Sequence, residues 1–385
     1  MREGWEYKKL GEVGTLQRGK GIQKTDFIED GQPCIHYGQL HTAFDISTKT
    51  HLTTIPSELY KNSILASKGD VLLALTSEDV EGSCKSTAWL GNYDIAVSSD
   101  AVILKHSLNP KFIVYYTRSR SFFIEKSKYA RGFKVTHIKT SDIAKIPIPV
   151  PPINIQQSIV SELDKINELI SLKKSQLEDL DSLAQSIFYD MFGDPVENEK
   201  GWEVKKLGEI GYCCSGGTPS RKIPEYFSGN INWFSAGELN NLYIDNSIEK
   251  ITQEALESSA AKLCPAKSLF IGMYDTAAFK MSIPKISSCS NQACANINPY
   301  KDNVIYLYFV LQAMKEEALK SRHGVRQKNL NLSYIKAFKI PLPPLSLQQT
   351  FAKRIEVIEQ QKQQINKTIK YLETLLASRM QYWFD

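Results

Sequence analysis

The sequence lacks long apolar runs, paired cysteine motifs and an apolar leader. Its most apolar short runs, such as residues 71–75, are far below the ~18 residues that a membrane span needs. The beginning, MREGWEYKKLG, contains no signal-like apolar region. The seven cysteines form neither an even disulfide framework nor CxxC pairs, so we expect reduced, mostly buried thiols. We therefore expect a cytoplasmic protein.

Catalytic and metal-binding signatures are also missing. The six histidines are scattered, without the paired spacing of a zinc site. The Asn/Asp-Pro-Pro-aromatic motif with which an adenine methyltransferase holds its base is absent, because Val150 and Ile153 flank the only paired prolines before residue 200. The acidic residues form no evident nuclease cluster. We predict no catalytic centre, metal or cofactor in this chain.

One stretch imitates a phosphate-binding loop. GTLQRGKG, from Gly14 to Gly21, nearly fits G-x4-G-K-[ST], but Gly21 supplies no hydroxyl for magnesium. The corresponding GYCCSGGT, from Gly211, lacks the lysine as well. We interpret the first stretch as a tight turn after Gly14, with Arg18 and Lys20 as solvated or phosphate-contacting cations.

Length and charge distribution favour several domains that bind a polyanion. The 385 residues exceed one ordinary domain of ~100–200 residues. Residues 1–155 carry 20 basic and 16 acidic side chains, and residues 201–347 carry 17 and 12. Residues 156–200 are acidic, with 4 basic and 10 acidic side chains. The positive charge therefore lies mainly in two globular stretches, which is a weak footprint for polyanion binding.

An internal repeat is the strongest signal. GWEYKKLGEVG, from Gly4, returns as GWEVKKLGEIG, from Gly201, with nine of eleven positions identical at an offset of 197. PVPPINIQQ, from Pro149, returns as PLPPLSLQQ, from Pro341, at an offset of 192. Each half thus has constant ends and a variable middle. Strand-like runs at 70–75, 101–105 and 268–272 and helix-like runs at 110–127 and 302–320 indicate that each middle is α+β.

A long amphipathic helix is predicted after each proline pair. Apolar residues recur at spacings of three and four over about 36 residues, or roughly 54 Å, with Lys173, Lys362 and Arg379 as interruptions. Such a seam is stable only when it is covered, and the other copy offers the complementary seam, although separate core helices are an alternative. Packing about a pseudo-two-fold axis would make the helices antiparallel, with the globular domains at opposite ends. The predicted seam residues are Leu163, Ile166, Ile170, Leu177, Leu180, Ile355, Ile358, Ile365, Ile369 and Leu372.

These patterns predict an α+β protein with two tandem globular domains joined by two antiparallel coiled-coil helices. We expect the first globular domain at 1–153, the first helix at 154–197, the second domain at 198–345 and the second helix at 346–385.

The repeat openings, SGGTPSR (215–221), INWFSAGEL (231–239) and the two PP-x3-QQ helix starts together resemble the specificity subunits of type I restriction-modification systems. The resemblance covers essentially the whole chain. It implies that each globular domain is a target recognition domain for one half of a split, asymmetric site in double-stranded DNA. It also implies that the helices dock two modification subunits holding S-adenosylmethionine, and that ATP- and Mg-dependent restriction subunits complete the assembly.

Candidate DNA contacts lie in matched segments of the two halves, where Lys and Arg can hold phosphates and polar side chains can reach base edges. LQRGKGIQKTDF in the first half stands where the second has CCSGGTPSRKIP, so we expect the two domains to read different half-sites. The candidates are Lys20, Lys24, Arg131, Lys134 and His137 in the first half and Arg221, Lys222, Arg322, Arg326, Gln327 and Lys328 in the second.

Two other interpretations stay open. A stand-alone nuclease or ATPase would cleave DNA or hydrolyse ATP without partners. A protein-only scaffold or decoy subunit would have no salt-sensitive affinity for DNA.

The matched loops generate a first prediction. Lys134→Ala and Arg326→Ala should weaken DNA binding without changing the preferred sequence, because a phosphate contact carries no base information. Competition binding against a panel of sequences measures this. A switch of preferred sequence in either variant would show that the residue reads a base.

Overall fold

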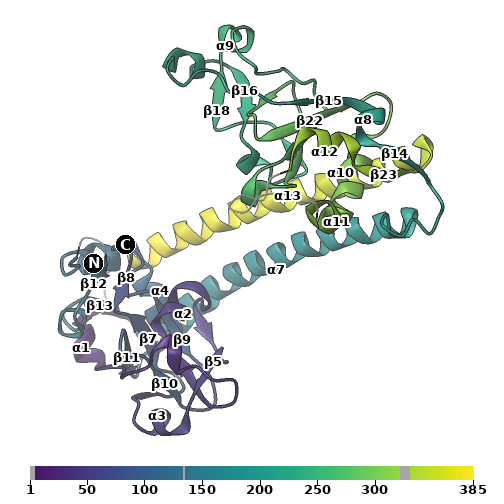
Figure 1. Cartoon of the computed structure of the whole chain (residues 1–385). Helices are drawn as coiled ribbons and strands as arrows, with labels where there is room; N and C mark the ends of the chain where they lie inside the picture. Colours follow the sequence, from purple (N-terminus) through teal and green to yellow (C-terminus); the bar gives the residue numbers. More distant parts are fainter. Residues whose placement is uncertain (1–4, 133–134, 321–329) are drawn as a thin grey trace. The chain divides into compact units, whose positions relative to one another are not determined.

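The computed structural model describes residues 5–132, 135–320 and 330–385. The chain forms two compact units: unit 1 consists of Met1–Lys174 and Lys367–Asp385, and unit 2 of Ser175–Asn366. Each unit has a globular part and portions of two long helices, α7 (Ile153–Phe192, teal) and α13 (Leu345–Phe384, yellow) (Figure 1). Both helices have 40 residues. They exceed the predicted 36 because each begins directly after its proline pair.

The globular part of unit 1 mixes strands and short helices. In chain order they are β1 (Glu6–Lys9), α1 (Leu10–Val13), β2 (Gly14–Arg18), η1 (Lys24–Asp26), β3 (Gln32–Ile35), α2 (Tyr37–Thr42), β4 (Ser47–Thr48), β5 (Thr53–Ile55), α3 (Ser57–Lys61), β6 (Leu65–Ala66), β7 (Val71–Ala74), β8 (Thr76–Ser77), β9 (Ser86–Trp89), β10 (Ile95–Val97), β11 (Ala101–His106), α4 (Pro110–Thr117), α5 (Arg120–Ser127), β12 (Thr136–His137), α6 (Thr140–Ile143) and β13 (Pro147–Val150).

Unit 2 follows the same order with small differences. Its elements are β14 (Glu203–Lys206), α8 (Leu207–Ile210), β15 (Gly211–Ser215), η2 (Pro224–Phe227), β16 (Ile231–Phe234), η3 (Ala236–Glu238), β17 (Tyr243–Ile244), β18 (Glu249–Ile251), α9 (Gln253–Glu257), β19 (Leu269–Gly272), η4 (Asp275–Ala277), β20 (Met281–Pro284), β21 (Cys289–Ser290), β22 (Cys294–Pro299), α10 (Val304–Ala313), α11 (Lys315–Lys320), α12 (Leu332–Ala337) and β23 (Lys339–Leu342). The α+β class and the predicted strand-like and helix-like runs are confirmed.

The five-stranded sheets of the two units correspond strand by strand, and the second sheets correspond except that unit 2 has no counterpart of β6 among its described strands. Unit 1 has a five-stranded sheet in the order β2-β11-β7-β9-β4, and unit 2 has β15-β22-β19-β20-β17. A second sheet has the order β5-β3-β10-β6 in unit 1 and β18-β16-β21 in unit 2. The core of each unit packs between these strands and the helices α4 or α10. The sequence repeat is therefore a repeat of topology.

The constant ends of each half pair with each other. In unit 1, β1 runs antiparallel to β13, with Tyr7 opposite Pro149, and in unit 2 β14 runs antiparallel to β23, with Val204 opposite Pro341. Prolines lack an amide donor, and these two-stranded edges are where a sheet tolerates them. The opening and the closing motif of each half thus form one small ribbon that closes the variable middle.

The glycine that ends each repeat opening is required by a close strand contact. A Cβ at Gly14 would lie 2.2 Å from the carbonyl oxygen of Lys105, and one at Gly211 would lie 2.7 Å from that of Asn298. The predicted turn after Gly14 is wrong, because these residues form β2 and pair with β11. Long-range strand pairing overrides the local turn composition. Arg18 forms an ion pair with Asp100, whereas Lys20 is exposed.

The QQ pair at each helix start has one buried and one exposed member. Gln156 accepts a hydrogen bond from the backbone N–H of Asn109 (2.8 Å) and donates to the carbonyl of Pro151 (2.8 Å). Gln348 accepts from the N–H of Asn303 (2.9 Å) and donates to Pro343 (2.9 Å). Asn109 and Asn303 are the N-caps of α4 and α10. Each buried glutamine therefore links the start of a long helix to the N-terminus of α4 or α10.

The last turn of each long helix packs into a globular core. The Phe192 ring, near the end of α7, lies 4.9 Å from the Tyr306 ring in unit 2. The Phe384 ring, near the end of α13, lies 5.5 Å from Phe112 and 5.8 Å from Tyr116 in unit 1. Phe192 and Phe384 are equivalent at the repeat offset of 192. Each long helix thus follows one repeat in the sequence, and its last turn packs into the core of the other repeat.

The two helices meet within each unit in antiparallel order. Of the ten predicted seam residues, eight are buried, while Leu177 and Leu180 are half-buried. In unit 1, Arg379 of α13 pairs with Glu162 of α7, which also accepts a hydrogen bond from the Trp383 indole (2.9 Å). In unit 2, Lys362 interrupts the seam and forms ion pairs with Asp181 and Glu359, both at 2.8 Å. Lys362 and Arg379 are therefore paired rather than buried alone.

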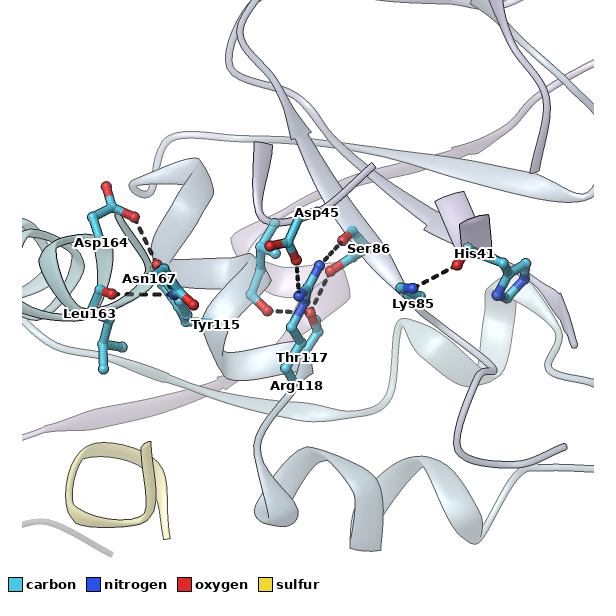
Figure 2. Close-up of polar contacts among 11 residues, drawn as sticks. His41, Asp45, Lys85, Ser86, Tyr115, Thr117, Arg118, Leu163, Asp164 and Asn167 are labelled. Atoms are coloured by element: carbon cyan, nitrogen blue, oxygen red, sulfur yellow. Dashed lines mark hydrogen bonds and ion pairs between the residues drawn. The ribbon is translucent and has the colours of Figure 1, made fainter. Parts of the chain in front are cut away.

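The start of α7 is fixed to α4 by a polar cluster. The Tyr115 hydroxyl donates to Asp164 (2.7 Å) and accepts from the Asn167 amide (3.0 Å), and Lys111 forms an ion pair with Asp164 (2.7 Å) (Figure 2 labels Tyr115, Asp164 and Asn167). Burial, followed by the hydrogen bond to Asp164, raises the pKa of Tyr115, so this hydroxyl stays protonated. The corresponding position in unit 2 is Phe309, which packs on Phe351 (5.1 Å).

The buried glutamine generates a prediction. Gln156→Ala should lower the free energy of unfolding by about 1–3 kcal/mol, because it leaves a buried N–H and a carbonyl without partners. Gln157→Ala is the matched control and should change the stability by less than about 0.5 kcal/mol, because Gln157 is exposed. Chemical denaturation measures both. Equal effects of the two substitutions would contradict the anchoring role.

Candidate nucleic-acid interface

The first candidate segment of unit 1 follows β2. The backbone N–H of Lys20 donates to the carbonyl of Val97 (3.0 Å), while its side chain is exposed. Lys24 begins η1 and is also exposed. Arg18 donates to the carbonyl of Ser99 (2.5 Å). This cationic segment is therefore attached to the turn at residues 98–100.

The second candidate segment of unit 1 is a hairpin attached to the same turn. Arg131 and His137 face each other as a bridge, with N–H to O distances of 3.2 and 2.8 Å. At the hairpin base, the N–H of Ile138 donates to the carbonyl of Leu75 (3.1 Å), and the N–H of Leu75 donates to the carbonyl of Asp100 (2.8 Å). The structure thus brings Arg131 and His137 together. Lys134 lies outside the described residues.

Three further residues, which the sequence did not single out, form a hydrogen-bond network with this hairpin. Thr76 hydrogen-bonds His137 Nδ1 through its hydroxyl (3.2 Å) and His41 Nε2 through its carbonyl (2.9 Å). The Lys85 amine donates to the His41 carbonyl (2.7 Å) (Figure 2). The sequence around His41, Thr76 and Lys85 does not indicate this network, because these three residues lie far apart in the chain. The folding of β7, β8 and α2 brings them together.

Beside this network, an ion pair supports the start of β9. Arg118 pairs with Asp45 and donates to the carbonyl of Ser86 (3.4 Å), and the Ser86 and Thr117 hydroxyls are 2.6 Å apart (Figure 2). Arg118 is therefore engaged within unit 1.

Unit 2 repeats the attachment of the first segment. The N–H of Gly217, the equivalent of Lys20, donates to the carbonyl of Ser290 (2.9 Å), next to the turn at residues 291–293. Lys222 is exposed. Arg221 is more than half exposed but already engaged: it forms two hydrogen bonds to Glu249 (2.5 and 2.7 Å) and lies over the Phe227 ring at 4.1 Å. The hydrogen bonds from Arg221 lower the pKa of the Glu249 carboxyl.

In unit 2, the described part of the corresponding region begins at Leu330. The N–H of Leu330 donates to the carbonyl of Met273 (2.7 Å), and the N–H of Met273 donates to the carbonyl of Ala293 (2.8 Å). These two bonds correspond to the bonds from Ile138 to Leu75 and from Leu75 to Asp100 in unit 1. The Lys280 amine donates to the Asn240 side chain (2.8 Å). Lys280 and Asn240 occupy the positions that Lys85 and His41 occupy in unit 1. The candidates Arg322, Arg326, Gln327 and Lys328 lie outside the described residues.

Three other features bear on chemistry. Within the described parts of the chain, no group of three or more His, Cys, Asp or Glu side chains could hold a metal ion. All seven cysteines are buried free thiols. Among the helices of the described residues, none is both long and apolar enough to cross a membrane.

Comparison with known proteins bears on the whole chain. A family model described as the type I restriction modification DNA specificity domain matches residues 2–181 and 199–373. The chain is 27% identical over 274 residues to the type I restriction enzyme EcoR124I/EcoR124II specificity subunit of Escherichia coli, with 67% of each protein covered. It is 22% identical over 411 residues to the MjaVIII specificity subunit of Methanocaldococcus jannaschii, covering 98% of this chain and 92% of that protein.

Solved structures share the fold. The S subunit of a type I restriction-modification system from M. genitalium matches with a TM-score of 0.58 at 15% identity, over 98% of this chain and 95% of that one. A chain from a structure concerned with complex assembly and conformational transition of the type I R-M system matches with a TM-score of 0.62 at 17% identity, over 100% and 98%. Two matches to the family model span both repeats, and the fold agrees. The chain therefore belongs to the family of type I restriction-modification specificity subunits.

Proposed function

We propose that this chain reads a bipartite, asymmetric site in double-stranded DNA and scaffolds a type I restriction-modification enzyme, without a catalytic centre of its own. The observation that carries this proposal is the duplicated arrangement around the turns at 98–100 and 291–293. In each unit, a segment bearing exposed cations and a second segment meet at the equivalent turn. Two such arrangements on one chain suit two half-sites.

The two units are proposed to read different sequences. The exposed cations Lys20 and Lys24 of unit 1 stand where unit 2 has Gly217, Arg221 and Lys222 in a longer segment. The Lys85 amine binds a backbone carbonyl, whereas its equivalent Lys280 binds the Asn240 side chain. Different side chains on equivalent backbone would present different hydrogen-bonding groups to base edges.

The long helices are proposed to dock the partners. Both carry exposed apolar side chains, at Leu169 and Leu172 on α7 and at Val357 and Tyr371 on α13. In this proposal, target recognition domains at 1–153 and 198–345 alternate with spacer helices at 154–197 and 346–385. Two modification subunits would hold S-adenosylmethionine, and restriction subunits would use ATP and Mg²⁺. The whole assembly would act on DNA in the cytoplasm.

A protein-only scaffold or decoy is the second candidate function. The ion pairs of Arg18, Arg118 and Arg221 favour it, because each of these arginines must exchange a carboxylate of this chain before it can hold a phosphate. Filter binding of the assembled complex to DNA at low and moderate salt separates the two. A steep loss of affinity with salt supports DNA reading, because phosphate contacts release counterions.

The methylome gives the most direct prediction. Cells that express this chain with its modification subunits should gain N6-methyladenine in one bipartite motif that is absent from cells without the chain. Long-read methylome sequencing measures this and gives both half-sites. An assembled complex that adds no motif would favour the decoy.

Segment exchange tests the assignment of one half-site to each unit. Replacing the segment between Gly14 and Pro149 with that of another family member should change one half-site only, because β1, the part of β13 from Pro149 onward, the whole β14–β23 ribbon and both long helices remain. The reciprocal exchange between Gly211 and Pro341 should change only the other half-site. Methylome sequencing of the two chimaeras is the readout, and a change in both half-sites from one exchange would refute the assignment.

A further inference from the structure

In each unit, one loop connects the five-stranded sheet to the second sheet, and the two loops are equivalent. Residues 49–52 join β4 to β5, and residues 245–248 join β17 to β18. The backbone hydrogen bonds next to the two loops match. The N–H of Leu90 donates to the carbonyl of Thr48 (2.8 Å), and the N–H of Lys285 donates to the carbonyl of Ile244 (2.9 Å). Both loops have four residues, so Leu52 and Ile248 are equivalent at an offset of 196.

These equivalent residues expose large aliphatic side chains. Leu52 is 59% exposed and Ile248 is 86% exposed. Outside α7 and α13, they are the most exposed of the large hydrophobic side chains described in their respective units. A single exposed aliphatic side chain needs no explanation. An exposed large aliphatic residue at the equivalent position of two middles that share little sequence indicates a common use.

The backbone of each loop is held in place. In unit 2, the N–H of Ile248 donates to Glu238 (2.8 Å), and the buried Ser247 hydroxyl accepts from the N–H of Trp233 (3.1 Å). In unit 1, the Thr48 hydroxyl donates to the carbonyl of Thr50 (2.8 Å) and accepts from the N–H of Thr50 (3.2 Å), and the His51 side chain hydrogen-bonds the Tyr93 hydroxyl (2.7 Å). The aliphatic side chains are therefore presented from anchored backbones, which lowers the entropic cost of a contact.

The same edge strands hold the candidate cationic segments. In unit 2, Glu249 follows Ile248 directly and binds Arg221. In unit 1, the N–H of Ile28, four residues after Lys24, donates to the carbonyl of Thr54 on β5 (3.1 Å). Two of the carboxylates near Ile248 are paired with cations, because Glu249 pairs with Arg221 and Asp245 with Lys285 (3.2 Å). The third, Glu238, accepts hydrogen bonds from the N–H groups of Ile248 and Ser235 (both 2.8 Å). These contacts direct the Glu238 oxygens into the chain and reduce the repulsion that a polyanion meets at this edge.

The surroundings of Leu52 and Ile248 suit DNA better than a protein. Their loop neighbours are polar or charged, namely Lys49, Thr50 and His51 in unit 1 and Asp245, Asn246 and Ser247 in unit 2. A stable protein interface buries about 800 Å² on each partner, with an apolar core, which one aliphatic side chain cannot supply. One such side chain does suffice to contact a thymine methyl group in the major groove.

We propose that Leu52 and Ile248 are specificity-determining residues, each contacting a thymine methyl group in the half-site that its unit reads. This inference rests on the proposed function. Each residue would favour thymine over cytosine at one position, by placing its apolar side chain against the 5-methyl group.

The test uses the complex of this chain with its modification subunits and the bipartite site from the methylome. Each thymine is replaced in turn by uracil, which removes only the methyl group. One replacement in the half-site read by unit 2 should weaken binding of the wild-type complex about fourfold, equivalent to ~0.8 kcal/mol for one buried carbon group. The Ile248→Ala complex should lose this sensitivity and bind both probes alike. Leu52→Ala should do the same for a thymine in the other half-site.

Val204→Ala is the matched control, because Val204 is an aliphatic residue of unit 2 that is 50% exposed on β14, outside the loop. This variant should keep the uracil sensitivity of the wild type. A wild-type complex that binds no bipartite site would refute the proposed function itself. The complex could also bind its bipartite site while no uracil replacement has an effect that depends on Ile248 or Leu52. That result would overturn this inference alone. Loss of subunit assembly in Ile248→Ala, measured without DNA, would also overturn it, by identifying a protein occupant.

Discussion

The structure depends on the need to cover the apolar stripe of two 40-residue helices. Neither helix can bury its stripe alone, because an isolated amphipathic helix in water gains too little from its own hydrogen bonds. The stripe is covered along the helix by the antiparallel partner and at the last turn by a globular core. Phe192 fills the core of unit 2 and Phe384 that of unit 1. Each repeat is therefore completed by the helix that follows the other, and the core of neither unit is built from one repeat alone.

The ribbons formed by the constant ends explain how the middles can differ. Because β1 pairs with β13 and β14 with β23, each variable middle begins and ends at one fixed base. The buried Gln156 and Gln348 connect this base to the long helices through the N-caps of α4 and α10. Changes at the turns of residues 98–100 and 291–293 therefore leave the base and the helices intact. This separation of frame and surface is what an interchangeable DNA reader requires.

The two units achieve the same packing with different chemistry. Unit 1 joins α4 to α7 through the Tyr115, Asp164 and Asn167 hydrogen bonds (Figure 2 shows the polar cluster), whereas in unit 2 the Phe309 and Phe351 rings pack edge to face. A satisfied polar cluster accepts few alternative partners, because an unmatched buried hydroxyl or carboxylate is costly. This difference distinguishes the two cores even though their topology is the same.

The sequence by itself determined the duplication, the α+β class and the two helices with their apolar seams, because identity at a fixed offset and helical periodicity are local signals. It also identified the resemblance that family membership confirmed. It did not determine that Gly14 begins a strand rather than a turn, that Gln156 points inward and Gln157 outward, or that Arg221 is held by Glu249. It could not align Leu52 with Ile248, because the middles share too little sequence. The tertiary structure decided these points, because each depends on strand pairing or on contacts between segments far apart in the chain, where burial and hydrogen-bond satisfaction outweigh local propensity.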